Sequence, residues 1–260
     1  MQTVLDQFEQ VPATIAALHG TLGNCLRAVY LHGSAVSGGL RPQSDIDLLV
    51  VVDRRMTQSE RAELSSSLLK LSGRHPSTPG GLRSLEVMVF SHPDLAAGRF
   101  PAQAEYVFGE WLRNAFEAGE TSMPAQNAEF TLVLAQAQQE AITLFGPDRD
   151  AFLPAIPMIE VRNGMRELLP ELLRGLREDT RNVLLTLARI WYTAENQTFV
   201  SKDEAASWAI PQLSDRSAVT LNHARRAYLG EVDDNWSRLQ DGVACLAEEL
   251  TSKVDLAMSA

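Results

Sequence analysis

The strongest constraint on the fold is a glycine–serine turn followed by two aspartates that open an apolar strand. Residues 31–34 read Leu-His-Gly-Ser, and residues 44–52 read Ser-Asp-Ile-Asp followed by five apolar residues. Because side chains alternate between the two faces of a strand, Asp45 and Asp47 are predicted to point the same way. The continuously apolar tail predicts a strand that is covered on both faces. The chain is therefore built around a covered sheet with two carboxylates at one strand end.

These two carboxylates make the strand end a candidate metal site. Adjacent anions repel each other unless a positive charge lies between them, and Mg²⁺ favours carboxylate and phosphate oxygens. Gly33 would let the backbone approach a ligand closely, and Ser34 offers a hydroxyl and an amide donor to a phosphate. Taken alone, the spacing of Asp45 and Asp47 is more typical of a solvated turn. The glycine–serine turn before it and the apolar run after it favour the metal site.

A further acidic residue lies inside the next predicted strand, residues 85–90. Glu86 is flanked there by apolar residues. A lone carboxylate in an apolar strand is unfavourable to bury unless it is paired. Either a paired, functional carboxylate or a surface-facing residue on an edge strand fits this pattern.

Helical periodicity accounts for most of the remaining chain. Thr57 with Glu60, and Ser201 with Glu204, have the spacing of a capping box at a helix start. Residues 128–144 are predicted to form one long helix that closes the first domain. Beyond it the apolar spacing is helical throughout, although Pro170 should kink or end the helix at 158–174.

The prolines and glycine near residues 146–157 indicate a linker between two domains. The sequence therefore predicts an α+β protein. Its N-terminal domain, residues 1–157, would contain a mixed sheet with helices. Its C-terminal domain, residues 158–260, would be an all-α helical bundle.

Composition limits the class of protein and its partners. The chain has 260 residues, a hydrophobic fraction of 45% and a formal net charge of −10. No segment approaches the roughly 20 apolar residues of a membrane span, and the N-terminus lacks the basic and apolar regions of a secretory signal. We therefore expect a cytoplasmic protein with no membrane partner. No basic face for nucleic acid is evident, whereas the acidity suits a small cationic substrate.

Several sequence words resemble a known enzyme family. Gly33-Ser34 followed by Asp45-Ile46-Asp47 is similar to the signature of the nucleotidyltransferase superfamily of polymerase-β type. The words LHGSAVSGGL, SDIDLLV, FGEWLR and VLLTLARIWYT resemble the aminoglycoside 3″/9 adenylyltransferases, the streptomycin and spectinomycin resistance enzymes. The resemblance covers nearly the whole chain and includes motifs in both halves.

The resemblance implies an ATP-dependent and Mg²⁺-dependent adenylyltransferase with an N-terminal nucleotidyltransferase domain. It would move AMP from ATP to the 3″-hydroxyl of streptomycin, the 9-hydroxyl of spectinomycin, or both, as a monomer. Asp45, Asp47 and Glu86 would hold about two Mg²⁺ ions, as in two-metal sites. Glu86 would also be the catalytic base. Gly33, Ser34 and Ser44 would contact the nucleotide.

The resemblance also assigns residues in the second half. The words TLARI, SKD and AYLG imply that Arg189, Lys202 and Tyr228 contact ATP. Trp111, Asp179 and Asn182 would hold the cationic antibiotic. Some relatives carry a histidine in place of Asn182 and a further carboxylate near residues 174–177, where this chain reads Arg-Gly-Leu-Arg.

Two other functions fit the same fold class. One is a nucleotidyltransferase that modifies RNA ends or a protein. The other is a non-catalytic nucleotide-binding or toxin-neutralising module. A degenerate module is expected to lose a carboxylate, and this chain retains Asp45, Asp47 and Glu86.

Overall fold

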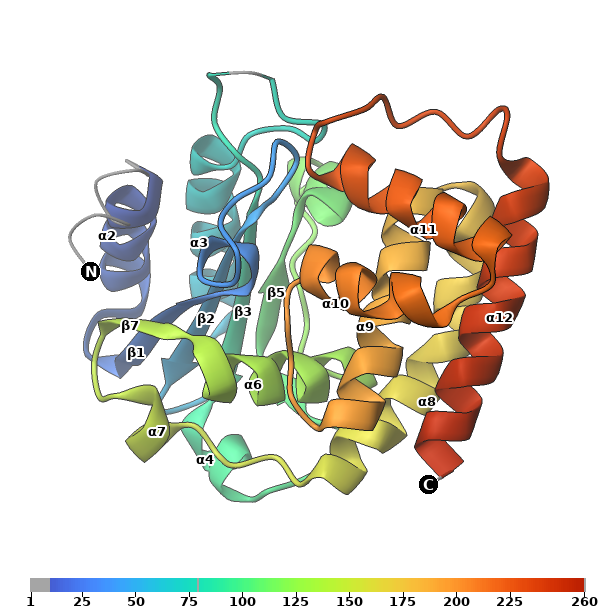
Figure 1. The fold of residues 1–260 in the computed structure, drawn as a ribbon. Coiled ribbons are helices and arrows are strands. Elements are labelled where there is room, and N and C mark those ends of the chain that lie inside the picture. Colours follow the sequence, from blue (N-terminus) through green and yellow to red (C-terminus); the bar gives the residue numbers. More distant parts are fainter. Residues whose placement is uncertain (1–9, 79, 260) are drawn as a thin grey trace. The chain divides into compact units, whose positions relative to one another are not determined.

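The computed structural model describes residues 10–78 and 80–259, and the chain divides into two compact units (Figure 1). The first unit extends to Ile156 and contains the β-strands, and the second begins at Pro157. Among the helices within 10–78 and 80–259, none combines the length and apolar character that a membrane span requires.

A five-stranded mixed sheet forms the centre of the first unit, in the order β5-β3-β2-β1-β7. Strands β2 and β3 are parallel, whereas the other neighbouring pairs are antiparallel. A mixed sheet in an α+β chain confirms the predicted class. The strands are β1 (Leu26–His32), β2 (Ile46–Val52), β3 (Leu85–Ser91), β5 (Tyr106–Phe108) and β7 (Ile142–Phe145).

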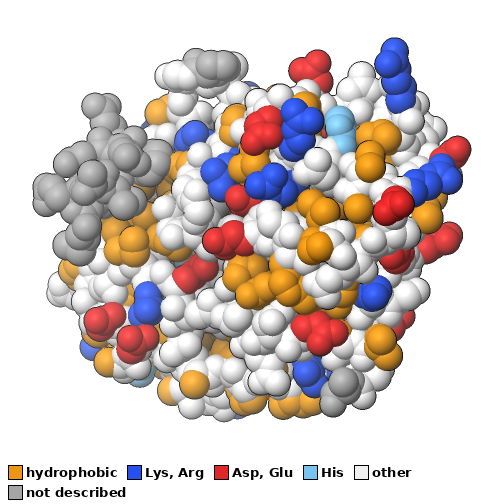
Figure 2. Space-filling model, viewed as in Figure 1, with side chains coloured by type: hydrophobic (Ala, Val, Ile, Leu, Met, Phe, Trp, Pro, Cys, Tyr) orange, Lys and Arg blue, Asp and Glu red, His pale blue; other side chains and the backbone are white. Residues whose placement is uncertain are grey.

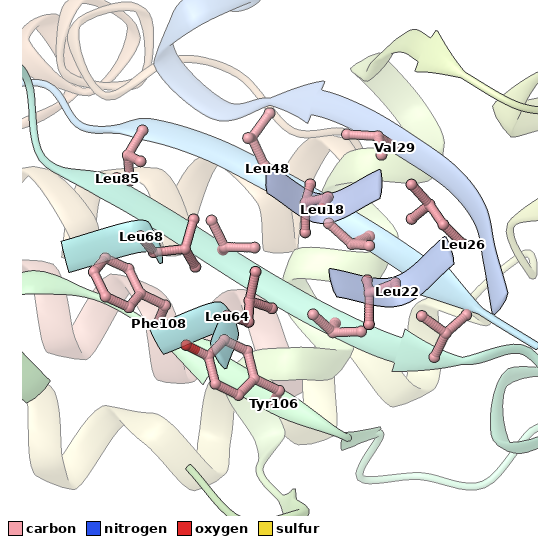
Figure 3. Packing of buried hydrophobic residues seen from close by; sticks show 14 of the residues in the cluster. Leu18, Leu22, Leu26, Val29, Leu48, Leu64, Leu68, Leu85, Tyr106 and Phe108 are labelled. Carbon is pink, nitrogen blue, oxygen red and sulfur yellow. The ribbon is translucent and has the colours of Figure 1, made fainter. Parts of the chain in front are cut away.

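Strand alternation divides the apolar side chains of the sheet between two cores. The first core lies between the sheet and helices α2 (Gln10–Leu22) and α3 (Gln58–Leu71), whose leucines meet Leu48 and Leu85 (Figure 3). The second core lies on the opposite face and includes side chains of α6 (Ala128–Glu140). Because both faces are covered, the apolar tail of β2 is fully buried, as its sequence predicts.

Short elements connect these strands and helices. They are η1 (Gly23–Cys25), η2 (Gly33–Ala35), α4 (His92–Ala96), β4 (Gln103–Ala104), η3 (Glu110–Leu112), α5 (Arg113–Glu117), β6 (Ala125–Gln126) and α7 (Arg149–Phe152). Strands β4 and β6 form a separate antiparallel pair.

The predicted helix over residues 128–144 is wrong at its C-terminal end. Helix α6 ends at Glu140, and Ala141 adopts an extended backbone with ψ 148°. The following segment, β7, pairs with β1 through Tyr30 opposite Thr143 and Leu31 opposite Ile142. The open edge of β1 supplies backbone hydrogen-bond partners that a longer helix would leave unused. Pairing with a distant strand therefore overrides the local helical pattern.

The second unit is built around a buried central helix. Its elements are α8 (Met158–Arg174), η4 (Gly175–Arg177), α9 (Thr180–Asn196), α10 (Lys202–Ala209), η5 (Ile210–Gln212), α11 (Asp215–Tyr228) and α12 (Gln240–Ser259). Helix α9 packs against α10, α11 and α12, and its buried stripe includes Val183, Leu187 and Trp191. Helix α8 continues past Pro170 to Arg174, so Pro170 does not end it. Pro170 is exposed, and water can take the place of its missing N–H donor.

Both predicted capping boxes are confirmed. The Thr57 hydroxyl accepts a hydrogen bond from Glu60 N, and the Glu60 carboxylate accepts one from Thr57 N. Ser201 and Glu204 make the same reciprocal pair at the start of α10. These pairs satisfy backbone donors at the first turn, where the helix offers no partner of its own.

Candidate active site

Two carboxylates lie side by side on neighbouring strands of the sheet. The register of the parallel pair places Asp47 of β2 directly opposite Glu86 of β3. Strand alternation puts Asp47 on the face of Leu49 and Glu86 on the face of Met88, which belong to the same core. Both carboxylates are half-buried. The two carboxylates therefore project to one side of the sheet from adjacent strands. Together with Asp45 we call them the carboxylate row.

Asp45 lies immediately before β2. Strand β2 begins at Ile46, whose N–H donates to Ser84 O at 2.9 Å, so Asp45 precedes the strand rather than opening it. Ile46 is fully buried in the first core. Asp45 and Asp47 flank it and are both half-buried, as the alternation of side chains predicts.

Gly33 presses against the carboxylate of Asp47. It begins η2 with φ +65°, a conformation that other residues rarely adopt, and its carbonyl accepts hydrogen bonds from Val36 N and Ser37 N. A Cβ atom at Gly33 would lie 2.1 Å from Asp47 Oδ2. The glycine is thus required twice, by the turn and by the close approach to the carboxylate.

The two predicted serines, Ser34 and Ser44, differ in burial. Ser34 lies in η2 and is half-buried, next to Gly33. Ser44 is buried, and its hydroxyl accepts a hydrogen bond from Arg41 N at 3.0 Å while Ser44 N donates to Arg41 O at 3.1 Å. The Ser44 hydroxyl therefore closes its own turn ahead of Asp45.

His32 lies beside the carboxylate row, on β1. It lies opposite Asp47 in the antiparallel pair of β1 and β2 and is 5% exposed. Burial lowers the pKa of the imidazole to about 4, so His32 is neutral at neutral pH. The neutral imidazole therefore adds no positive charge beside Asp47.

The FGEWLR segment presents Trp111 at the surface. The indole is 61% exposed, and it lies so close to Gly109 that a Cβ there would be 2.2 Å from the ring. Arg113 donates to both oxygens of Glu110 at 2.6 and 2.7 Å, and Ser72 donates to the same carboxylate. Burial alone would raise the pKa of Glu110, but the hydrogen bonds from Arg113 and Ser72 outweigh it and hold the pKa below its ordinary value. This bidentate Arg113–Glu110 pair, the Glu110–Arg113 fork, fixes the turn that carries Trp111.

Five of the predicted residues belong to the second unit. Asp179 is the exposed N-cap of α9, Asn182 and Arg189 lie on the same helix, Lys202 is the first residue of α10 and Tyr228 is the last of α11. The structure brings two of them together, because Lys202 Nζ donates a hydrogen bond to Asn182 Oδ1.

Comparisons with known proteins identify the family. Residues 151–253 match the pattern described as aminoglycoside adenylyltransferase, C-terminal domain, and residues 22–79 match polymerase beta, nucleotidyltransferase. A spectinomycin 9-adenylyltransferase of Staphylococcus aureus is 38% identical over 96% of each chain. An aminoglycoside (3″)(9) adenylyltransferase of Klebsiella pneumoniae is 36% identical over 94% of this chain and 95% of its own. The chain belongs to the aminoglycoside adenylyltransferase family.

A solved structure of this adenylyltransferase family has the same fold. The crystal structure of spectinomycin adenyltransferase from Enterococcus faecialis with ATP and spectinomycin superposes with a TM-score of 0.89 at 27% identity. It covers 95% of this chain, and this chain covers 98% of it.

The two matched patterns cover most of the predicted site residues. The nucleotidyltransferase pattern over residues 22–79 spans Gly33, Ser34, Ser44, Asp45 and Asp47, and the pattern over residues 151–253 spans all five residues of the second unit. Glu86 and Trp111 lie between the two matched ranges.

The carboxylate row fits Mg²⁺ that arrives with phosphate. Within residues 10–78 and 80–259, no three His, Cys, Asp or Glu side chains are grouped so that they could hold a metal ion by themselves. Mg²⁺ is commonly held by one or two carboxylates together with substrate phosphates and water. Asp47 and Glu86 supply hard oxygens from adjacent backbones, and Gly33 puts no Cβ atom against the Asp47 carboxylate. The donors suit a metal–nucleotide complex better than a free ion.

Proposed function

We propose that this protein transfers AMP from ATP to a hydroxyl of spectinomycin, at position 9, and thereby confers resistance. The observation that carries the proposal is the register of Asp47 opposite Glu86 on one sheet face, within a chain of the aminoglycoside adenylyltransferase family. Spectinomycin is preferred because the relative from Staphylococcus aureus and the solved structure both name it. Streptomycin, at position 3″, is the second candidate acceptor, since the relative from Klebsiella pneumoniae is named for both positions.

The residues of the first unit would carry the chemistry. Asp45, Asp47 and Glu86 would hold Mg²⁺, which when bound neutralises phosphate charge. The Glu86 carboxylate would accept the proton of the drug hydroxyl as its oxygen attacks the α-phosphorus. The bond between the α-phosphorus and the bridging oxygen then breaks, and pyrophosphate leaves. Gly33 and Ser34 would approach the phosphates through backbone N–H groups and the hydroxyl.

The residues of the second unit, which we take to be an all-helical bundle domain, would contribute binding. Arg189 and Lys202 supply positive charge for the triphosphate, and Tyr228 would contact the nucleotide. Trp111, in the first unit, has an exposed aromatic ring, and Asp179, in the second, has an exposed carboxylate; each suits a cationic drug. We place the reaction in the cytoplasm, where ATP is abundant, and expect a monomer.

The rival functions have weaker support. On the face drawn in Figure 2, acidic and basic side chains are interspersed, and the formal net charge is −10. A polyanion such as RNA is usually bound by a basic stripe. A non-catalytic module gives no reason to keep Asp47 and Glu86 in register. The first argument favours a small cationic acceptor, and the second favours an enzyme.

Expression in a susceptible bacterium tests the proposed function. The wild-type chain should raise the inhibitory concentration of spectinomycin, whereas the Glu86→Gln variant, at equal soluble expression, should not. Parallel cultures with streptomycin report whether the second drug is also an acceptor. If the wild-type chain protects against neither drug, the proposed function fails.

Replacing Gly33 with alanine should damage transfer through Asp47. The new Cβ would collide with Asp47 Oδ2 at 2.1 Å and would strain a backbone at φ +65°. We expect kcat/KM to fall by about tenfold to a hundredfold, because displacement of a catalytic group by about 1 Å can have effects of this size. Steady-state kinetics of AMP transfer measure it.

Gly39→Ala is the matched control for this change. Gly39 also has a positive φ of +87°, but a Cβ there meets nothing within 4 Å. It reproduces the backbone strain without the contact to Asp47. Equal losses in both variants would show that strain in the turn, rather than the position of Asp47, limits the reaction.

Trp111→Ala should weaken binding of the antibiotic while leaving the KM for ATP unchanged. An aromatic ring facing a cation contributes about 0.5–2 kcal/mol, so we expect the KM for the drug to rise by about twofold to thirtyfold. Streptomycin, the bulkier and guanidinium-bearing drug, should be affected more than spectinomycin. Met123→Ala, at another exposed apolar residue (65%), is the control. A rise in the KM for ATP would remove Trp111 from the drug site.

A further inference from the structure

The side chain of Arg83 donates hydrogen bonds to the loop that precedes β2, the strand that carries Asp47. Arg83 Nη1 donates hydrogen bonds to Arg41 O at 3.0 Å, to Ser44 O at 2.9 Å and, at the limit of 3.5 Å, to Pro42 O. These carbonyls belong to the turn 41–44 that Ser44 closes and that leads directly into Asp45. A cationic donor shared among several carbonyls fixes the path of the turn.

The backbone of Arg83 is itself held in place. Arg83 N donates to Gln10 Oε1 at 2.8 Å, and Arg83 O accepts from Gln10 Nε2 at 2.9 Å and from Gly73 N at 2.9 Å. Gln10 Nε2 also donates to Leu71 O at 2.8 Å, at the end of α3. The first residue of α2 thus ties together the end of α3 and the entry to β3.

Arg83 stands three positions before Glu86 in the chain. Its backbone enters β3, which carries Glu86, and its side chain holds the turn that carries Asp45 into β2. A second hydrogen bond, from Ser77 N to Gln43 Oε1 at 2.9 Å, joins the turn 41–44 to the connection between α3 and β3. Relative movement of β2 and β3 at this end of the sheet would change the spacing of the carboxylates. The Arg83 side chain opposes that movement.

We propose that Arg83 is a positioning residue that sets the affinity of the carboxylate row for Mg²⁺ and ATP. Arg83 acts through the turn 41–44 on Asp45, and through β3 on Glu86. This inference rests on the proposed function only in that Asp45, Asp47 and Glu86 receive Mg²⁺ with the nucleotide. It goes beyond the proposed function because it adds a residue that acts through backbone carbonyls of the turn 41–44.

Calorimetric titration of the full chain with ATP, at a series of Mg²⁺ concentrations and without antibiotic, tests the proposal. Arg83→Met keeps the aliphatic stem and removes the donors. We expect the Kd for Mg²⁺–ATP and the Mg²⁺ concentration for half-saturation to rise by about tenfold, as loss of hydrogen bonds from a charged donor allows. Arg83→Lys keeps the charge without the planar fork and should show an intermediate rise.

Arg74→Met is the matched control, because Arg74 is exposed in the same connection and pairs with Glu117 at 2.7 Å instead of with the turn. It should leave both quantities unchanged. The proposal is supported if both quantities rise by more than about threefold in Arg83→Met and stay unchanged in Arg74→Met. A smaller rise in Arg83→Met overturns it. A lower Tm with unchanged Mg²⁺ half-saturation would show a structural role only. If Arg83→Met does not fold, the same threefold limit is applied to Arg83→Lys.

The outcome is separable from the proposed function. A wild-type chain that binds Mg²⁺–ATP but adenylylates no drug would contradict the function and still test Arg83. A wild-type chain that binds no Mg²⁺–ATP would overturn both.

Discussion

Replacing Glu86 with glutamine should lower kcat/KM for AMP transfer by at least about a thousandfold while the fold remains largely intact. Glutamine has the shape of glutamate but cannot accept the proton of the drug hydroxyl, and it is a poorer metal ligand. Glu86 lies opposite Asp47 on a shared face, so the loss occurs at the centre of the carboxylate row. Steady-state kinetics with a thermal melt of each variant provide the measurement.

Glu117→Gln is the matched control for Glu86→Gln. Glu117 is a half-exposed carboxylate that pairs with Arg74 and Arg113, and it lies on α5 rather than in the row. It should retain wild-type turnover. If Glu86→Gln keeps more than about a tenth of wild-type turnover, Glu86 is not the base, because loss of a general base costs about 10²–10⁴-fold.

The largest stability effect is expected at a buried ion pair remote in sequence from the site residues. Glu105 is fully buried, accepts a hydrogen bond from Arg61 at 2.8 Å, and also accepts one from Met56 N at 3.1 Å. Arg61 itself is 7% exposed. Glu105→Ala leaves the Arg61 guanidinium buried without this carboxylate. We therefore expect the free energy of unfolding to fall by about 3–5 kcal/mol. Denaturant unfolding measures the change.

Two variants make this prediction specific. Arg74→Met removes an exposed pair, with 67% and 43% of the two side chains accessible, and should cost below about 1 kcal/mol. The double variant Arg61→Met/Glu105→Leu removes both charges and should recover most of the stability lost in Glu105→Ala. If Glu105→Ala costs no more than Arg74→Met, the buried pair does not stabilise the first unit.

The parts of the fold that local pattern decides could be predicted from the sequence. Alternation and apolar runs locate β2 and β3, and side-chain spacing identifies the capping boxes at Thr57 and Ser201. Strand β7 could not be found in this way, because its residues continue the helical pattern of α6. Only the open edge of β1, more than a hundred residues earlier in the chain, makes them a strand.

The candidate site shows the same division. Alternation predicts that Asp45 and Asp47 share a face, but the register that sets Asp47 against Glu86 depends on pairing between distant strands. The Glu110–Arg113 fork has three-residue spacing and could have been read from the sequence. Arg83 lies in a connection without periodicity, and its partners are carbonyls more than thirty residues away, so no sequence pattern indicates its role.

Mass spectrometry of spectinomycin after incubation with the purified full chain, ATP and Mg²⁺ tests the central claim most directly. The account predicts a drug that has gained one adenylyl group, in a reaction that needs both ATP and Mg²⁺ and that Glu86→Gln does not support. Streptomycin in a parallel reaction reports the second acceptor. Unmodified spectinomycin and streptomycin, recovered from reactions in which the folded chain binds Mg²⁺–ATP, would contradict the account.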